Sequence, residues 1–168
     1  MENFDFNSIT FSSQEHKSNF IECCKLHQDT GRDLDCEVIA LFYLISLIEE
    51  VKTDVKHRVY NFQRRAINPE CLKDFWQTVS TLKALRLAYN LWSGYVENSG
   101  KAIYSTPHEI FDDYWAPYFV QAIKLRFRSS FDPNPNFCRT IYGTKRSSNN
   151  SIFEKMQVMN LLLLSHLL

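Results

Sequence analysis

Glycine and proline are scarce in this chain of 168 residues, with four and five copies respectively. Such low numbers exclude collagen-like repeats and long glycine-rich or proline-rich linkers. Apolar residues make up 45% of the chain and aromatic residues 14%, enough to form a hydrophobic core. A chain of this length removes roughly 70% of its unfolded surface from water in one domain. The composition therefore predicts a single folded domain over residues 1–168.

Long hydrophobic runs are also missing. The stretch CEVIALFYLISLI spans only residues 36–48, whereas a membrane-spanning helix needs about 20 apolar residues. The first residues, MENFDFNSITF, lack the positively charged start of a secretory signal. Five cysteines, an odd number in no framework spacing, do not suggest disulfides. We therefore expect a cytoplasmic protein with no membrane partner.

Familiar catalytic motifs are absent as well. The sequence has no glycine-rich phosphate loop, nucleophile elbow or dinucleotide fingerprint. Ser80 and Lys83 match the Ser-x-x-Lys pattern of penicillin-recognising enzymes, but the Ser-Asp-Asn and Lys-Thr-Gly elements that accompany this pattern are missing. The sequence therefore favours a protein that is not an enzyme, and it leaves open a catalytic site without a local motif.

Two pairs of residues have the spacing of metal ligands. His108 and Asp112 are four positions apart, as are Cys23 and His27, so each pair shares one face of a helix. Helix capping already explains the acids near His108, and no third ligand follows either pair at a suitable spacing. We therefore expect no metal and no other cofactor, and we interpret the cysteines as buried or half-buried thiols.

Two segments predict central helices. In residues 36–48 apolar side chains occupy every direction around the axis, which is typical of a helix covered on all sides. In residues 79–92 a polar stripe about 80° wide interrupts an otherwise apolar surface. The stripe consists of Lys83, Arg86, Asn90 and Ser93. We expect only this stripe to meet water, and we expect Gly94 to end the helix.

A capping box predicts an earlier helix. Ser12 and Glu15 have the required spacing, and the helix should run to about His27 before Gly31 ends it. Its inward residues should be Phe20, Ile21 and Cys24.

Another start signal lies near residue 106. Thr106 as the cap and Pro107 at the first helical position predict a helix, which Pro117 kinks or restarts. The inward face of the second part should consist of Tyr118, Phe119, Ala122, Ile123 and Phe127.

These signals together predict an all-α fold, a compact single-domain helical bundle or orthogonal helical array of about five to seven helices. A short extended segment, residues 4–11, should precede the first helix. Core helices should occupy residues 12–128, a turn-rich basic loop region residues 129–150, and a C-terminal helix residues 151–168.

Charge is unevenly distributed along the chain. Residues 1–50 carry three Lys and Arg against ten Asp and Glu, and residues 51–168 carry sixteen against nine, so the two parts have opposite net charges. We expect an electrically two-faced molecule. In the C-terminal third, basic residues alternate with aromatic ones, a combination that binds phosphate and stacks on bases. The candidate binding residues are Lys124, Arg126, Arg128, Arg139, Lys145 and Arg146.

Four stretches, IALFYLISL, WQTVSTLKALRLAYNLWSG, STPHEIFDD and APYFVQAIKLR, resemble a family of small proteins from Gram-positive bacteria, their phages and mobile elements. That family is defined only as a domain of unknown function. The likeness covers about residues 11–128 and brings no catalytic or binding residues with it. The resemblance implies a place on mobile DNA, where compact proteins often act by binding one host protein, for example to inhibit a defence nuclease.

We therefore expect a non-enzymatic interaction module that binds a host protein and inhibits or regulates it. The charge asymmetry would complement such a partner. The alternative is a nucleic-acid-binding protein that uses the basic C-terminal third, with an affinity that falls steeply as salt rises.

Overall fold

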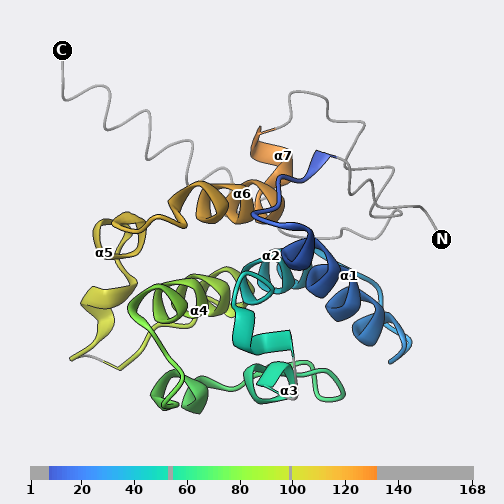
Figure 1. Ribbon diagram of the computed structural model, residues 1–168, viewed down its shortest axis with the longest axis horizontal. Helices are drawn as coiled ribbons and strands as arrows, with labels where there is room; N and C mark the ends of the chain where they lie inside the picture. Colours follow the sequence, from blue (N-terminus) through green and yellow to red (C-terminus); the bar gives the residue numbers. More distant parts are fainter. Residues whose placement is uncertain (1–7, 53–54, 99, 132–168) are drawn as a thin grey trace, which may run out of the picture.

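Helices occupy most of the residues that the computed structural model describes, which are 8–52, 55–98 and 100–131 (Figure 1). The elements, in chain order, are α1 (Gln14–Gln28), α2 (Cys36–Ile45), η2 (Glu49–Lys52), α3 (Val55–Val59), β1 (Tyr60–Asn61), β2 (Ala66–Ile67), η3 (Pro69–Lys73), α4 (Val79–Ser93), η4 (Ala102–Ser105), α5 (Pro107–Phe111), α6 (Ala116–Arg126) and α7 (Arg128–Phe131), where η denotes a 3-10 helix. The prediction of a helix-dominated fold is confirmed.

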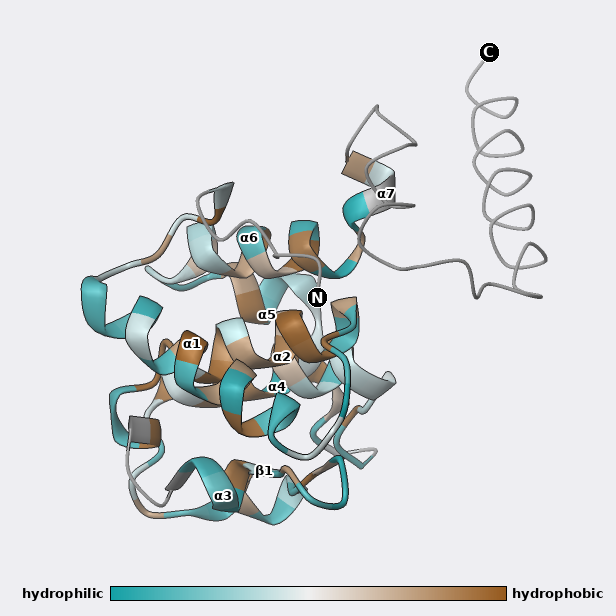
Figure 2. Ribbon diagram, turned by 90° about the vertical axis from the view of Figure 1, so that its right-hand side faces the viewer, coloured by the Kyte–Doolittle hydropathy of each residue, from teal (hydrophilic) through white to brown (hydrophobic). Residues whose placement is uncertain are grey.

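Helix α2 lies at the centre of the fold. The Asp35 carboxylate accepts a hydrogen bond from the Val38 amide at 2.8 Å and so caps the first turn. From Val38 to Ile45 every residue is at most 1% exposed, because α1, α4 and α6 all pack against this helix. In Figure 2, α2 lies behind α1 and between α6 and α3. The prediction of a helix covered on all sides is confirmed, although the helix ends at Ile45 and not at residue 48.

His16 provides a hydrogen-bond partner for a backbone carbonyl at the C-terminal end of α2. The helix stops at Ile45, and the Leu47 amide bonds to Leu44, so the Tyr43 carbonyl lacks its usual partner in the helix. His16 Nε2 lies 2.8 Å from that carbonyl, and the Ser12 amide donates to Nδ1 at 3.2 Å. A carbonyl only accepts, so Nε2 carries the proton. Nδ1 accepts from an amide and carries none, so the imidazole is neutral. Burial accordingly lowers the pKa of His16 to about 4.

Helix α4 is the second central rod. The side chains of Thr78 and Thr81 form a reciprocal capping box, and Gly94 ends the helix in the left-handed conformation at φ 73°. Its fully buried residues are Ala84, Leu85, Ala88 and Tyr89. The predicted helix over residues 79–92 and its glycine stop are confirmed.

The polar stripe of α4 does not meet water in the way the periodicity predicts. The side chains of Lys83 and Arg86 are each only 12% exposed. Lys83 donates to the Asp112 carbonyl and lies 4.0 Å from the Asp113 carboxylate, while Arg86 pairs with Glu97. The expectation for these two residues was wrong, because the segment that follows α4 folds back over the stripe and brings acids to it.

Two predicted helix starts are corrected in detail. Helix α1 is capped by Ser13, whose Oγ accepts from the His16 amide at 3.0 Å, because Ser12 is used instead to contact the His16 ring. Helix α5 starts at Pro107 as predicted, but the Thr106 hydroxyl donates backward to the Ile103 carbonyl at 2.8 Å and does not cap.

The inward face of α6 is confirmed except at its last residue. Phe119 and Ala122 are fully buried, and Tyr118 and Ile123 pack against the core. Phe127 is 44% exposed, because the chain leaves the helical conformation there at φ −112° and ψ 38°. The predicted C-terminal helix and the loop region after residue 131 lie outside the described residues.

A small hairpin, which the sequence analysis did not predict, lies between α3 and η3. Strand β1 pairs with β2 in antiparallel register, with Tyr60 opposite Ile67. The buried hydroxyl of Tyr89 lies 2.9 Å from the Val59 carbonyl and 3.1 Å from the Asn68 carbonyl, and so ties both ends of the hairpin to α4. Within the described segments, none of the helices combines the length and the apolar character that crossing a bilayer requires.

Candidate functional site

Exposed apolar side chains lie on the segments that precede, begin and follow α4. We call this group the aromatic edge, and it consists of Phe75, Val79, Ile103, Tyr104 and Tyr114. Phe75 is 99% exposed and Tyr114 is 73% exposed. Side chains of this size normally enter a core or an interface, so their exposure on and beside elements that contact α4 makes these segments a candidate recognition surface.

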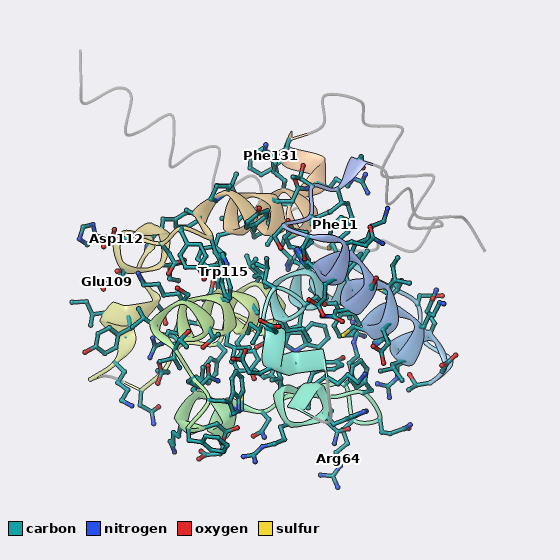
Figure 3. The ribbon with its side chains drawn as sticks, in the orientation of Figure 1. Phe11, Arg64, Glu109, Asp112, Trp115 and Phe131 are labelled. Carbon is teal, nitrogen blue, oxygen red and sulfur yellow. The ribbon has the colours of Figure 1, made fainter. Side chains whose placement is uncertain are left out.

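Three polar contacts place Tyr114 on this edge. The Ser80 hydroxyl donates to Asp113 Oδ2 at 2.8 Å, and Asp113 Oδ1 accepts from the Trp115 amide at 2.9 Å. Lys83 lies 4.0 Å from the same carboxylate. Figure 3 shows Asp112 on the outer side of α5. Since Asp113 is held against the first turns of α4, its neighbour Tyr114 points outward.

Arg86 holds Tyr104, the aromatic residue of η4, beside α4. Its guanidinium pairs with Glu97 and lies 5.1 Å from the centre of the Tyr104 ring. Such a cation–π contact contributes about 0.5–1 kcal/mol at a partly exposed site. Figure 1 shows η4 and α5 beside the beginning of α4, and all three elements are in contact. The ion pairs of Lys83 and Arg86 therefore hold the η4 and Tyr114 parts of the aromatic edge against α4.

The Ser-x-x-Lys pattern has a structural role here. Ser80 donates its proton to a carboxylate, and Lys83 donates to a carbonyl and lies close to that carboxylate. These contacts join α5 to α4, so both side chains are engaged in holding the fold together.

The two pairs with metal-ligand spacing are far from forming a site. His108 and Asp112 are exposed, while Cys23 and His27 are buried in the core. His27 Nε2 lies 3.2 Å from the Asp33 carbonyl, and Cys23 Sγ lies 4.0 Å from the Ser46 hydroxyl. Over residues 8–52, 55–98 and 100–131, no three potential ligands come together around a common point.

The cysteines of the described chain are unpaired thiols. Burial raises the pKa of Cys23 to about 12, that of Cys36 to about 11 and that of Cys71 to about 11. The pKa of Cys24 also rises for the same reason. Because the thiolate is the reactive form, these side chains are poor nucleophiles in the folded protein.

The predicted basic residues have different environments. Lys124 is exposed and Arg128 is half-buried. Arg126 pairs with Glu37 at 2.8 Å and donates to the Leu91 carbonyl, also at 2.8 Å, so its guanidinium joins α6 to the N-terminus of α2 and the end of α4. The remaining three candidates, Arg139, Lys145 and Arg146, lie outside the described residues.

Some acidic residues of the N-terminal part form ion pairs with basic residues of the later part of the chain. Two acids at the start of α2, Asp35 and Glu37, pair with Arg65 and Arg126 from the later part of the chain. Glu22 of α1 likewise pairs with a lysine of α3. Charges that are separated in sequence therefore neutralise each other across elements, which reduces the two-faced character that their sequence distribution predicted.

Residues of the aromatic edge come from three separate segments, so sequence periodicity could not have identified the edge as a unit. Only an indirect signal existed, since Phe75, Ile103 and Tyr114 lie outside the regular apolar pattern of the predicted helices.

Comparison with known proteins places the chain in a family. The model of a family of unknown function, DUF6075, matches residues 6–137. The chain belongs to this family. Neither the search of curated proteins nor the search of solved structures found a match. This membership confirms that the chain resembles a family of unknown function.

Proposed function

We propose that this DUF6075 protein is a non-enzymatic interaction module, encoded by a phage or mobile element of Gram-positive bacteria, that binds a host protein and inhibits or regulates it. The aromatic edge is the observation that supports this proposal. Tyrosine and phenylalanine are enriched in the buried centres of protein interfaces, where charged residues are depleted.

The edge has the physical properties of a protein-binding surface. Two ion pairs that form without a partner, Lys83 with Asp113 and Arg86 with Glu97, hold the segments that carry Tyr104 and Tyr114 against α4, so binding would order little additional backbone. A protein that covers Tyr114 and Ile103 would remove apolar area from water at about 25 cal/mol per Å². Glu109 of helix α5, which lies between Tyr104 and Tyr114 in the chain, would pair with a cation at the rim.

Affinity capture from a bacterial host lysate tests this proposal. The tagged full-length protein should retain one stoichiometric partner, and the double variant Ile103→Ser with Tyr114→Ser should lose it. Both side chains are exposed, so the substitutions should leave folding intact. Val120→Ser on α6 is the matched control, since Val120 is also exposed but lies outside the edge. A partner held equally by the wild type and the double variant would exclude the edge as the binding surface.

A further inference from the structure

The solvent side of α6 carries unusually little charge. The residues that this helix buries against the rest of the fold are Phe119, Ala122 and Leu125. The exposed residues of the helix are Pro117, Val120 and Lys124. At 100° per residue these lie on the opposite side, where a helix that faces only water is normally polar. Only Lys124 among them is charged, so the outer side of α6 has the character of a second packing face.

Two phenylalanines extend this face beyond the end of α6. Val120 is 42% exposed, Phe127 is 44% exposed and Phe131 is 56% exposed. Figures 1 and 2 both show α7 projecting beyond α6 on the side away from α2 and α4, and Figure 3 shows Phe131 at its end. We call Val120, Phe127 and Phe131 the outer stripe. The described chain therefore ends on an apolar surface that its own helices leave uncovered.

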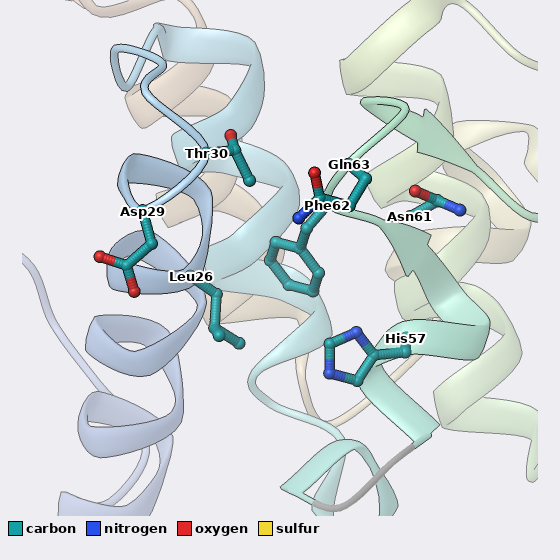
Figure 4. Close-up of a pocket in the computed structure, with 7 residues that line it drawn as sticks. All are labelled: Leu26, Asp29, Thr30, His57, Asn61, Phe62 and Gln63. Carbon is teal, nitrogen blue, oxygen red and sulfur yellow. The ribbon is translucent and has the colours of Figure 1, made fainter.

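The hollow between the end of α1 and the α3–β1 segment, drawn in Figure 4, offers no comparable surface. The Phe62 ring in it is only 4% exposed, because it packs against the rings of Phe42 and Tyr60. An apolar segment would find little area to cover there.

The sequence after the outer stripe contains a segment that suits it. Residues 151–168, SIFEKMQVMNLLLLSHLL, lie outside the described residues. Together with Lys124, the outer stripe has a spacing of four, three and four residues, which is the repeat of a seam between two helices. Apolar residues of the segment recur at the same spacing, namely Ile152, Met156, Met159 and Leu163.

The connection between the two parts is long enough for them to meet. Residues 132–150 span at most about 65 Å, at roughly 3.3–3.6 Å per residue. Helix α6, with 11 residues, is about 16 Å long. Attachment through a linker of this length gives the segment a local concentration in the millimolar range, an advantage over any separate partner.

We propose that residues 151–168 pack along the outer stripe of the same chain as an amphipathic helix. The apolar side chains of the segment and of the stripe then cover each other. Lys124 borders the contact, where its long stem lets the amine reach water.

Hydrogen–deuterium exchange of the full-length protein, measured by peptide mass spectrometry, tests the proposal. If the segment is docked for most of the time, amides of residues 151–168 should exchange at least about tenfold more slowly than in an unstructured chain. Isolated helices of roughly this length are marginal in water, so slow exchange would indicate packing. Protection that appears only at high protein concentration would place the segment on a second copy and overturn the proposal.

Substitutions on the outer stripe make the test specific. The double variant Val120→Asp with Phe131→Asp should raise the exchange of residues 151–168 to that of an unstructured chain, while α1, α2 and α4 stay protected. Both side chains are exposed, so folding should be retained. The matched control is Ile103→Asp with Tyr114→Asp on the aromatic edge, which should leave the segment protected. Fast exchange of the segment in the wild type, unchanged protection in the stripe variant, or an equal loss in the control would overturn the proposal.

Discussion

Protonation of His16 should destabilise the fold as the pH falls from 7 to 5. The side chain is 2% exposed, and its neutral ring bridges the Ser12 amide and the Tyr43 carbonyl. Burial lowers the pKa of His16 from 6.5 to about 4. In the unfolded chain the same imidazole titrates near its ordinary value of about 6.5. Between these two values the unfolded state therefore binds more protons than the folded state.

The magnitude follows from this difference in pKa. Each pH unit within the window removes about 1.4 kcal/mol from the free energy of unfolding. The contribution is fully present above the unfolded pKa and is lost as the pH falls toward the folded pKa. Since only part of the interval from pH 7 to pH 5 lies inside the window, the expected loss is about 2 kcal/mol.

Urea denaturation of the wild type and of His16→Gln at pH 7, 6 and 5 measures this effect. Glutamine keeps an amide donor that can reach the Tyr43 carbonyl, but it does not titrate. Burial also lowers the pKa of His27, which both proteins retain, so their difference isolates His16. The wild type should lose about 2 kcal/mol more than the variant between pH 7 and pH 5. Parallel pH profiles for the two proteins would refute this account of His16.

Four further predictions concern polar and thiol groups. In chemical denaturation, Arg126→Ala should lower the free energy of unfolding by about 2 kcal/mol, because the Glu37 carboxylate and the Leu91 carbonyl lose their partner. The control Lys124→Ala should change it by less than about 0.5 kcal/mol. If the basic C-terminal third binds nucleic acid, Lys124→Glu should instead weaken a low-salt gel shift at unchanged stability, and an unaffected shift would count against that alternative. Tyr89→Phe should cost about 1–2 kcal/mol in the same denaturation assay, since its hydroxyl joins α4 to the hairpin, and an unchanged midpoint would contradict this role. Cys23 and Cys71 should resist alkylation at pH 8 until urea unfolds the protein, because burial raises the pKa of both thiols. Peptide mass spectrometry measures the labelling, and rapid labelling of the folded protein would disprove their burial.

Periodicity was sufficient to predict the two central helices. In residues 36–48 and 79–92 the apolar pattern is a local property of each segment, and burial against any neighbour satisfies it. The stop at Gly94 is also local, because it acts on the backbone within one turn. Predictions of this kind need no knowledge of which element covers which, and the structure confirms them.

Contacts between distant residues could not be predicted in the same way. Glu37 and Arg126 are 89 positions apart, and their ion pair depends on how α6 crosses the start of α2. The imidazole of His16 reaches the end of α2 only because α1 packs beside it. In each case the sequence shows a polar residue whose partner depends on the packing of whole elements.

The aromatic edge could not be predicted for the same reason. A helical wheel of α4 shows a polar stripe and assigns it to water, because the wheel does not include the chain that follows. In the structure Glu97 and Asp113 are drawn to that stripe by Arg86 and Lys83, so the segment between them lies across the polar side of α4. The apolar side of α4 is already covered by α2 and α6. Ile103 and Tyr104 belong to this segment and do not reach the core, so they remain on the surface. The ion pairs that cover the stripe therefore also hold in place this part of the surface that we propose for recognition.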